Sequence, residues 1–214
     1  KLSSLDFVLE NNDTIPPDKG IFLNITRRLN KKICNYISTS FYDSRLTSDP
    51  ITETRSVNLK LDPIKDEGLF YVPIEHSGCS QRSDEEADLI EKTYNRIIKK
   101  EFKVGKKLGK ISSKDIMVVA PYNAQANNIR ERLKKKNDDV RVGTIDLFQG
   151  QEAKVVLISM TSSDVESLPR HKDFFFSRNR LNVAISRAEC VAIIIFNENL
   201  LLASASSIKE MKLM

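Results

Sequence analysis

The segment Arg180-Leu181-Asn182-Val183-Ala184-Ile185-Ser186-Arg187-Ala188 lies just before a strongly apolar run, Val191-Ala192-Ile193-Ile194-Ile195-Phe196. In the first segment apolar residues recur at helical spacing, which predicts a short helix with one small apolar face. The second segment predicts a buried strand that holds this helix against a sheet. Because Arg187 follows Arg180 by seven residues, about two helical turns, we expect both cations to leave the helix on roughly one side.

The chemistry of Arg187 has two interpretations. A guanidinium held rigidly at a sheet edge can neutralise charge that develops on a γ-phosphate during phosphoryl transfer. In the alternative, Arg187 bonds the C-terminal carbonyls of its helix and a neighbouring carboxylate, which is a structural role. This segment alone favours the structural role, and the rest of the chain reverses that preference.

Runs of Val and Ile that alternate with amphipathic helices predict an α/β fold with a mostly parallel sheet covered by helices on both faces. Buried strands are predicted at 116–120, 140–145, 155–160 and 191–196, an edge strand at 69–74, and helices at 24–41, 83–100, 124–135 and 200–211. The Ser83-Asp84-Glu85-Glu86 sequence predicts a capping box at the start of the second helix. The intervening regions are predicted to be a lead-in (1–22), an irregular or edge region (43–68), a basic loop (103–114) and a polar loop (162–177).

The composition fits one soluble, intracellular domain over residues 1–214. The chain is 40% hydrophobic and 29% charged, and no apolar run approaches the roughly 20 residues that span a bilayer. Three widely spaced cysteines suit reduced structural thiols, and neither histidine has a partner at metal-ligand spacing, so no metal site is predicted. The net charge of +5 is compatible with phosphate binding, but the lysine clusters at 99–100, 106–107 and 134–136 are most simply solvated.

One segment superficially resembles a nucleotide-binding P-loop. Gly105-Lys106-Lys107-Leu108-Gly109-Lys110-Ile111 has three residues between its glycines, where the P-loop has four. Ile111 also stands where a Ser or Thr would reach magnesium. The sequence therefore contains no P-loop at this position.

Two further segments offer groups suited to a nucleotide. Thr144 ends a predicted strand and could donate to a phosphate, Gly150 would let a ligand approach the main chain, and Glu152 could accept bonds from ribose hydroxyls. The alternative is a helical connection capped by Gly150. Arg27 and Arg28 lie at a predicted helix start, where a cation needs an anionic partner, either a structural carboxylate or a phosphate.

A strand end with exposed polar groups is predicted at Ala120-Pro121-Tyr122-Asn123-Ala124-Gln125. Tyr122 could stack on a base there, while the amides of Asn123 and Gln125 could contact a sugar-phosphate backbone. A tyrosine that simply packs over the loop explains the pattern equally well.

Taken in order, these segments resemble the second RecA-like domain of superfamily 1 helicases, in the branch of the nonsense-mediated-decay helicase and its prokaryotic relatives. Thr26-Arg27-Arg28-Leu29 looks like motif IV, although the family usually has Tyr-Arg-Met there. Asp146-Leu147-Phe148-Gln149-Gly150-Gln151-Glu152 looks like motif V, and 180–187 looks like motif VI. Pro121-Tyr122 and Gln125 are similar to the family's Pro-Tyr…Gln segment. The likeness covers about 20–202.

The resemblance implies roles for individual residues. Arg187 would be the arginine finger and Arg28 a second γ-phosphate sensor. Gln149, Gly150 and Glu152 would contact the nucleotide, with Glu152 at the ribose. Single-stranded nucleic acid, DNA rather than RNA, would contact five residues on the adjoining face: Pro121, Tyr122, Gln125, Thr144 and Asn182.

The resemblance also implies that half of the motor lies elsewhere. The P-loop and the Asp-Glu pair that holds Mg²⁺ belong to the first RecA-like domain, so ATP and Mg²⁺ would be held mainly by that N-terminal partner domain. The chain would serve an ATP-dependent helicase and would not hydrolyse ATP alone, because an arginine finger supplies no nucleotide cradle. The alternative is a non-catalytic nucleic-acid or protein-binding module that has a motor fold.

Overall fold

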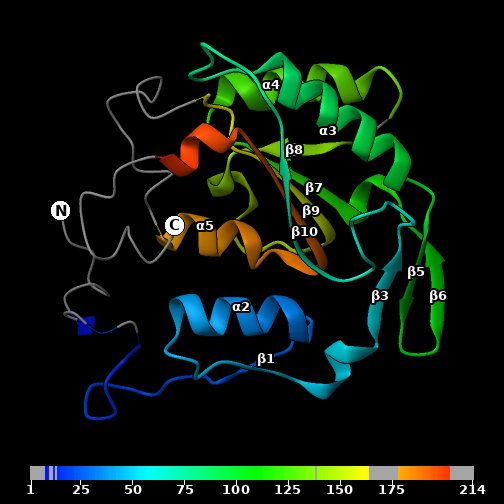
Figure 1. Cartoon of the computed structure of the whole chain (residues 1–214). Helices are drawn as coiled ribbons and strands as arrows, with labels where there is room; N and C mark the ends of the chain where they lie inside the picture. The colour runs from blue at the N-terminus through cyan, green and yellow to red at the C-terminus, as the bar shows by residue number, and fades with distance from the viewer. Residues whose placement is uncertain (1–7, 10–11, 13, 138, 164–177, 203–214) are drawn as a thin grey trace.

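The computed structural model describes residues 8–9, 12, 14–137, 139–163 and 178–202. Its centre is a five-stranded sheet in which every neighbouring pair is parallel. The strands, in their order across the sheet, are β4 (Gly68–Pro73), β10 (Ala188–Phe196), β9 (Ala153–Ser159), β7 (Ile116–Val119) and β8 (Arg141–Gly143). Figure 1 shows helices on both sides of this sheet, which confirms the predicted fold class.

The alternation of side chains along the buried strands builds two cores. On one face, β7, β9 and β10 pack against α3 (Asp84–Ile97) and α4 (Asn123–Lys134), with Ile193 and Leu157 fully buried. On the other face, the intervening residues, among them Ala192 and Ile158, pack against α2 (Lys31–Phe41) and α5 (Arg178–Ile185). Both faces are covered, which explains why these strands read as continuous runs of Val and Ile rather than alternating ones.

Helix α2 begins later than the sequence predicts. Asn30 caps it, because its side chain accepts a hydrogen bond from the Ile33 amide at 3.0 Å. Upstream, β1 (Ile25–Thr26) pairs in parallel with β2 (Thr47–Ser48). Arg27 and Arg28 therefore lie between a strand and a helix, not in the first helical turn, and the helix dipole does not act on them as expected.

The predicted basic loop after α3 is instead a β-hairpin. Strands β5 (Glu101–Val104) and β6 (Lys107–Lys110) pair antiparallel, and β5 also pairs with β3 (Arg55–Asn58) to make a three-stranded sheet. Gly105 opens the two-residue turn with a φ of +60°, which glycine adopts without steric cost. The irregular region before β4 thus contributes one strand to this second sheet, as well as the 3₁₀ turn Pro50–Thr54.

The capping box at α3 is only half formed. The Ser83 side chain accepts from the Glu86 amide at 3.1 Å, as predicted. The Glu86 carboxylate does not return to the Ser83 amide, which donates to Gln125 Oε1 at 2.9 Å. Glu86 is fully buried and joins a separate polar network.

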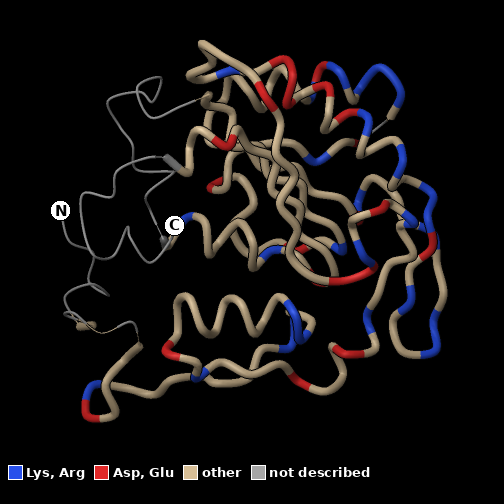
Figure 2. Tube along the Cα trace, in the orientation of Figure 1, with Lys and Arg blue, Asp and Glu red and all other residues tan. Residues whose placement is uncertain are grey.

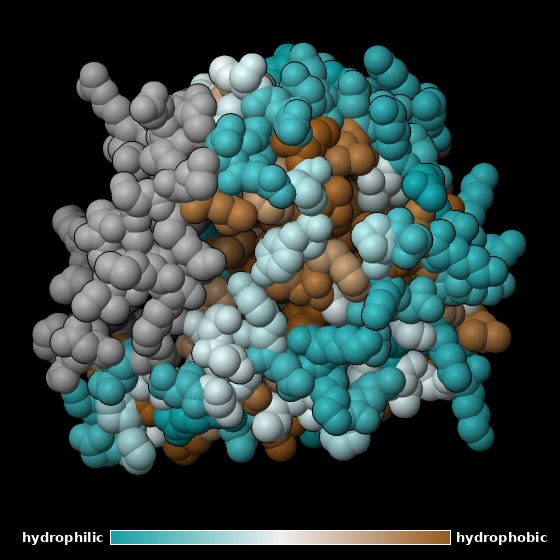
Figure 3. Space-filling model, in the orientation of Figure 1, coloured by the Kyte–Doolittle hydropathy of each residue, from teal (hydrophilic) through white to brown (hydrophobic). Residues whose placement is uncertain are grey.

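In the view of Figure 3, hydrophobic residues gather near the middle of the face and hydrophilic residues surround them. Within the part of the chain that the structure describes, no helix combines the length and apolar character needed to cross a bilayer.

Candidate functional site

Three segments that lie far apart in the sequence bring Arg28, Glu152 and Arg187 to one edge of the central sheet. Arg28 lies between β1 and α2, Glu152 directly precedes β9, and Arg187 directly precedes β10. Arg28 Nε donates to Glu152 Oε2 at 2.7 Å, and Arg28 Nη1 donates to the Ser186 carbonyl at 3.3 Å. Because β9 and β10 both start here, this cluster lies at the amino-terminal edge of the sheet and not at the carboxyl edge where ligands of such sheets usually bind.

Arg187 is a buried cation without a carboxylate partner among the described residues. The residue is only 9% exposed, and among the described residues its side chain donates one hydrogen bond, from Nη1 to the Gln151 carbonyl at 3.3 Å. Its Nε is buried and has no acceptor within the described part of the chain. Burial, and secondly the nearby charge of Arg28, lower the pKa of Arg187. An anion bound between the two guanidinium groups would compensate both effects.

The structural alternative for Arg187 is therefore only partly realised. The carbonyl that it bonds belongs to Gln151, ahead of β9, and not to the last turn of α5. Helix α5 ends at Ile185, so Arg187 lies beyond it. The expectation that Arg180 and Arg187 leave one helix on the same side is wrong for this reason: Arg180 lines a groove at the other edge of the sheet.

The Arg28–Glu152 pair borders a cavity of about 600 Å³. Its wall combines polar groups with apolar side chains of β1, of α2 and of the connection between them, including Ile25, Leu29 and Ile37. Asn182 lines this cavity, and its Nδ2 donates to Tyr42 Oη at 3.0 Å. Asn182, which the resemblance assigns to nucleic acid, thus lies beside the arginine cluster and not among the residues that line the groove at the opposite edge.

The motif V segment is partly the helical connection that the alternative interpretation predicts. A 3₁₀ turn, η3 (Ile145–Phe148), follows β8, Gln149 caps it, and Gly150 takes a φ of +77°. Gln149 and Gly150 are both exposed, and neither is among the residues that line the 600 Å³ cavity. Their contact with a nucleotide stays a prediction, because it requires a nucleotide bound outside the 600 Å³ cavity.

At the carboxyl-terminal edge, the ends of β7 and β8 border a groove of about 400 Å³. Four residues that the sequence analysis places at nucleic acid line it: Pro121, Tyr122, Asn123 and Thr144. Arg180, Gln81 and Asp146 are among the other residues that line it. Tyr122 is half-buried, and burial raises the pKa of its hydroxyl.

Gln125 does not reach this groove, which corrects the expectation that its amide contacts nucleic acid. The side chain is fully buried. Its Nε2 donates to the Ser83 carbonyl at 3.0 Å and to Ser159 Oγ at 3.2 Å, while Oε1 accepts from the Ser83 amide. Gln125 therefore ties the start of α4 to the start of α3 and fixes the backbone on which Tyr122 stands.

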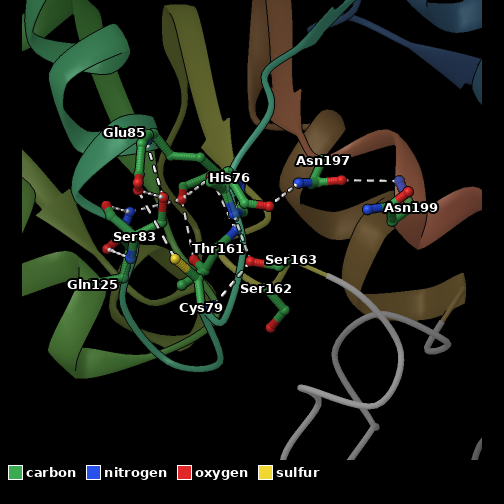
Figure 4. Close-up of polar contacts among 12 residues, drawn as sticks. His76, Cys79, Ser83, Glu85, Gln125, Thr161, Ser162, Ser163, Asn197 and Asn199 are labelled. Carbon is green, nitrogen blue, oxygen red and sulfur yellow. Dashed lines mark hydrogen bonds and ion pairs between the residues drawn. The ribbon is translucent and has the colours of Figure 1, made fainter.

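Behind the groove lies a buried polar network that sequence reasoning missed (Figure 4). Glu86 accepts two bonds of 2.9 Å from the Thr161 amide, and a third bond of 3.1 Å joins it to His76 Nε2. His76 Nδ1 lies 2.8 Å from Ser163 Oγ, which also accepts from the Cys79 amide. The order acid–histidine–serine looks like a nucleophilic triad, but Glu86, His76 and Ser163 are inaccessible, so the network positions strand ends and does no chemistry on a substrate.

Two signals could have located the missed residues. Arg180 and Gln81 are long polar side chains next to predicted strand ends or helix starts, and such positions converge at one edge of a parallel sheet. A weaker signal indicated the Glu86 network: Glu86 is a carboxylate on the helix face that also carries the buried apolar residues of α3. Over the described ranges, no group of three or more His, Cys, Asp or Glu residues could hold a metal ion.

Comparison with known protein families matches residues 3–199 to an AAA domain. A relative from Methanocaldococcus jannaschii, named an uncharacterized ATP-dependent helicase, is 32% identical over 86% of this chain and 28% of its own length. The DNA polymerase alpha-associated DNA helicase A of Schizosaccharomyces pombe is 31% identical over 83% of this chain and 28% of its own length. The DNA-binding protein SMUBP-2 of Rattus norvegicus is 27% identical over 78% of this chain and 17% of its own length. The chain thus spans less than a third of each of these relatives.

Proposed function

The chain belongs to an AAA domain family whose relatives are named helicases, and from this premise we propose that it is the C-terminal motor domain of an ATP-dependent helicase. In this proposal residues 1–214 form one RecA-like domain of an intracellular protein. A first RecA-like domain of the same polypeptide would carry the P-loop and the magnesium ligands. The isolated chain would then not hydrolyse ATP.

The observation that carries the proposal is the uncompensated guanidinium of Arg187. A buried cation with a single carbonyl acceptor costs folding free energy, and the cost is compensated if an anion binds during the working cycle. The triphosphate of ATP, held by the partner domain together with Mg²⁺, is an anion of suitable charge. When the two domains close, Arg187 would neutralise charge on the γ-phosphate as it is transferred.

Arg28 and Glu152 would act beside it. Glu152 neutralises Arg28 in the structure, and this pair is partly exposed, so a γ-phosphate can replace the carboxylate as the partner of Arg28. Glu152 would then be released to accept from the ribose hydroxyls. The exchange would make the positive charge of this edge available only when nucleotide is present.

Single-stranded nucleic acid would occupy the groove at the opposite edge. Tyr122 offers a partly exposed ring for base stacking, and Thr144 and Arg180 stand where they can contact phosphates. We propose DNA in preference to RNA. Strands β9 and β10 run from the arginine cluster to this edge, so the cluster and the groove would move as one rigid unit. Domain closure on ATP would therefore carry the groove along the bound nucleic acid.

The decisive experiment is the oligonucleotide-stimulated ATPase rate of the full-length protein with Arg187→Ala. We expect a loss of about 10³–10⁵ in turnover with single-strand affinity retained. Arg27→Ala is the matched control, because Arg27 lies next to Arg28 but is 85% exposed and pairs with Asp49. Turnover of Arg187→Ala equal to that of the control would rule out the proposed role, and the chain would then be a binding module with a motor fold.

A further inference from the structure

The net positive charge of the chain is concentrated in one hairpin. Residues 99–110, which we call the lysine hairpin, contain six lysines and one glutamate and therefore carry a formal charge of +5. The whole chain also carries +5, from 34 basic and 29 acidic residues. The remaining 28 basic and 28 acidic residues balance, so the rest of the molecule has no net charge. Figure 2 shows the lysines of the hairpin along one side of the molecule.

The lysines of the hairpin differ from many others in their surroundings. Elsewhere lysines of the described surface pair with carboxylates, for example Lys32 with Glu67 at 2.9 Å and Lys136 with Glu91 at 3.0 Å. Within the described residues, no lysine of the hairpin lies within 4 Å of a carboxylate oxygen. Five of them are exposed: Lys99, Lys103, Lys106, Lys107 and Lys110. This local charge is therefore uncompensated.

The hairpin is held rigidly against the body of the protein. Strand β5 pairs with both β3 and β6, and Phe102 lies opposite Gly109 in the ladder. A Cβ at Gly109 would come within 2.5 Å of the Phe102 ring, so glycine allows the ring to lie across the strand. Lys154, at the start of β9, places its Nζ 4.2 Å from the centre of the same ring. These contacts fix one face of the hairpin.

The other face and the tip present the lysines to solvent. Lys103 pairs with Leu108, and Glu101 pairs with Lys110, so by the two-residue period of strands Lys103 and Lys110 share a face. Lys106 and Lys107 extend this charge around the turn. A rigid strand loses less conformational freedom on binding than a flexible loop does, which suits a charged contact.

This surface is separate from the groove at the carboxyl-terminal edge. The hairpin packs at the start of β9, through Lys154, and β3 adjoins the start of β10, where Arg55 Nη1 lies 3.7 Å from Glu189 Oε2. The lysine hairpin therefore flanks the amino-terminal edge of the sheet (Figure 1). The single-strand groove lies at the carboxyl-terminal edge, so a strand in that groove does not account for the lysines.

We infer that the lysine hairpin binds the sugar-phosphate backbone of duplex nucleic acid. This inference rests on the proposed function in that it assumes a protein that acts on nucleic acid. Lysines bind phosphates as point charges without reading sequence. Phe102 is the sole aromatic residue of the hairpin, and it packs against the body. A surface that bound single strands would be expected to offer rings for base stacking, whereas a duplex offers two rows of phosphates and hides its bases.

The test compares two ligands with the full-length protein: a single-stranded oligonucleotide, and a duplex that carries the same single-stranded tail. Affinity is measured by fluorescence anisotropy as salt is raised. For Lys103→Gln/Lys107→Gln/Lys110→Gln we expect the slope of log affinity against log salt to fall by about 2–3 on the tailed duplex, close to one for each phosphate contact removed. On the single strand the slope should not change.

The matched control removes three exposed lysines from the α3 and α4 surface, Lys92→Gln/Lys134→Gln/Lys135→Gln, and should leave both slopes unchanged. If the hairpin variant and the wild type had equal slopes on the tailed duplex and both still bound the single strand, the inference would be overturned and the proposed function would stand. A fall of the same size on both ligands would also overturn it, because the lysines would then follow the single strand. If the wild type bound neither ligand, this inference and the proposed function would both be refuted.

Discussion

Replacing Arg187 with methionine should make the domain more stable and should remove the proposed ATPase activity of the full-length protein. Methionine keeps a long flexible side chain in the site and removes the buried charge. Exchanging buried charged groups for apolar ones of similar volume raises the free energy of unfolding by about 1–4 kcal/mol. Loss of the hydrogen bond to the Gln151 carbonyl lowers it by about 0.5–1.5 kcal/mol. We therefore expect residues 1–214 with Arg187→Met to be more stable by about 1–2 kcal/mol.

Urea unfolding followed by circular dichroism measures this difference. The midpoint should rise with an unchanged dependence on denaturant, because the surface exposed on unfolding stays nearly the same. Arg27→Met, at the exposed neighbouring arginine, should stay within about 0.5 kcal/mol of the wild type. Inorganic phosphate at ten times its dissociation constant should stabilise the wild type by about 1.4 kcal/mol and Arg187→Met by clearly less.

The opposite result would refute the reasoning. If Arg187→Met were less stable than the wild type by 1 kcal/mol or more, the guanidinium would be a structural group that holds the strand ends together. Its lack of a carboxylate partner would then say nothing about a ligand.

Three more predictions concern other parts of the molecule. Tyr122→Ala in the full-length protein removes one stacked base and should raise the oligonucleotide concentration that half-saturates the ATPase by about 5–100-fold. The KM for ATP should not change, and an equal rise in both quantities would contradict the groove assignment. In the native chain a thiol reagent should label Cys79 rapidly and leave Cys34 and Cys190 unmodified, because both are buried and burial raises the pKa of Cys190 to about 12. Labelling of all three cysteines in mass spectrometry would contradict the buried placement. Burial raises the pKa of Asp115, but hydrogen bonds from Lys154 and Ser112 outweigh this effect and leave the pKa below its ordinary value. The carboxylate therefore stabilises the fold above about pH 4, and this contribution disappears as the pH falls through the folded-state pKa. Asp115→Asn should cost about 1 kcal/mol at pH 7 and should lose less stability than the wild type as the pH falls below the ordinary pKa of an aspartate, whereas an identical loss in both proteins would exclude the mechanism.

The central sheet could be predicted from the sequence because its strands are buried on both faces. Runs such as Ile116–Val119 and Val191–Phe196 have no polar face, and in an α/β chain only a covered parallel sheet accommodates them. The hairpin at Glu101–Lys110 escaped prediction for the converse reason. Only Phe102 and Val104 alternate with its lysines, and the pairing with Arg55–Asn58, distant in sequence, decides that the segment is a strand.

The roles of the candidate site residues stay predictions, and the sequence predicted their placement only in part. Helical spacing puts Arg180 and Arg187 on one side only if the helix continues, and α5 ends at Ile185, so the two arginines reach opposite edges of the sheet. Gln125 was predicted as a contact because amides suit phosphate backbones, and Asn182 because the family resemblance implies it. Each is buried by packing that no local pattern reveals.

The measurement that tests the central claim most directly compares two ligands of the full-length protein: ADP, and ADP with aluminium fluoride, which imitates the phosphoryl group in transfer. The account predicts that Arg187→Ala weakens binding of the transition-state mimic by about 10³-fold or more and binding of ADP by less than about threefold, because the guanidinium acts on charge that develops only during transfer. Equal weakening of both ligands, or of neither, would contradict it.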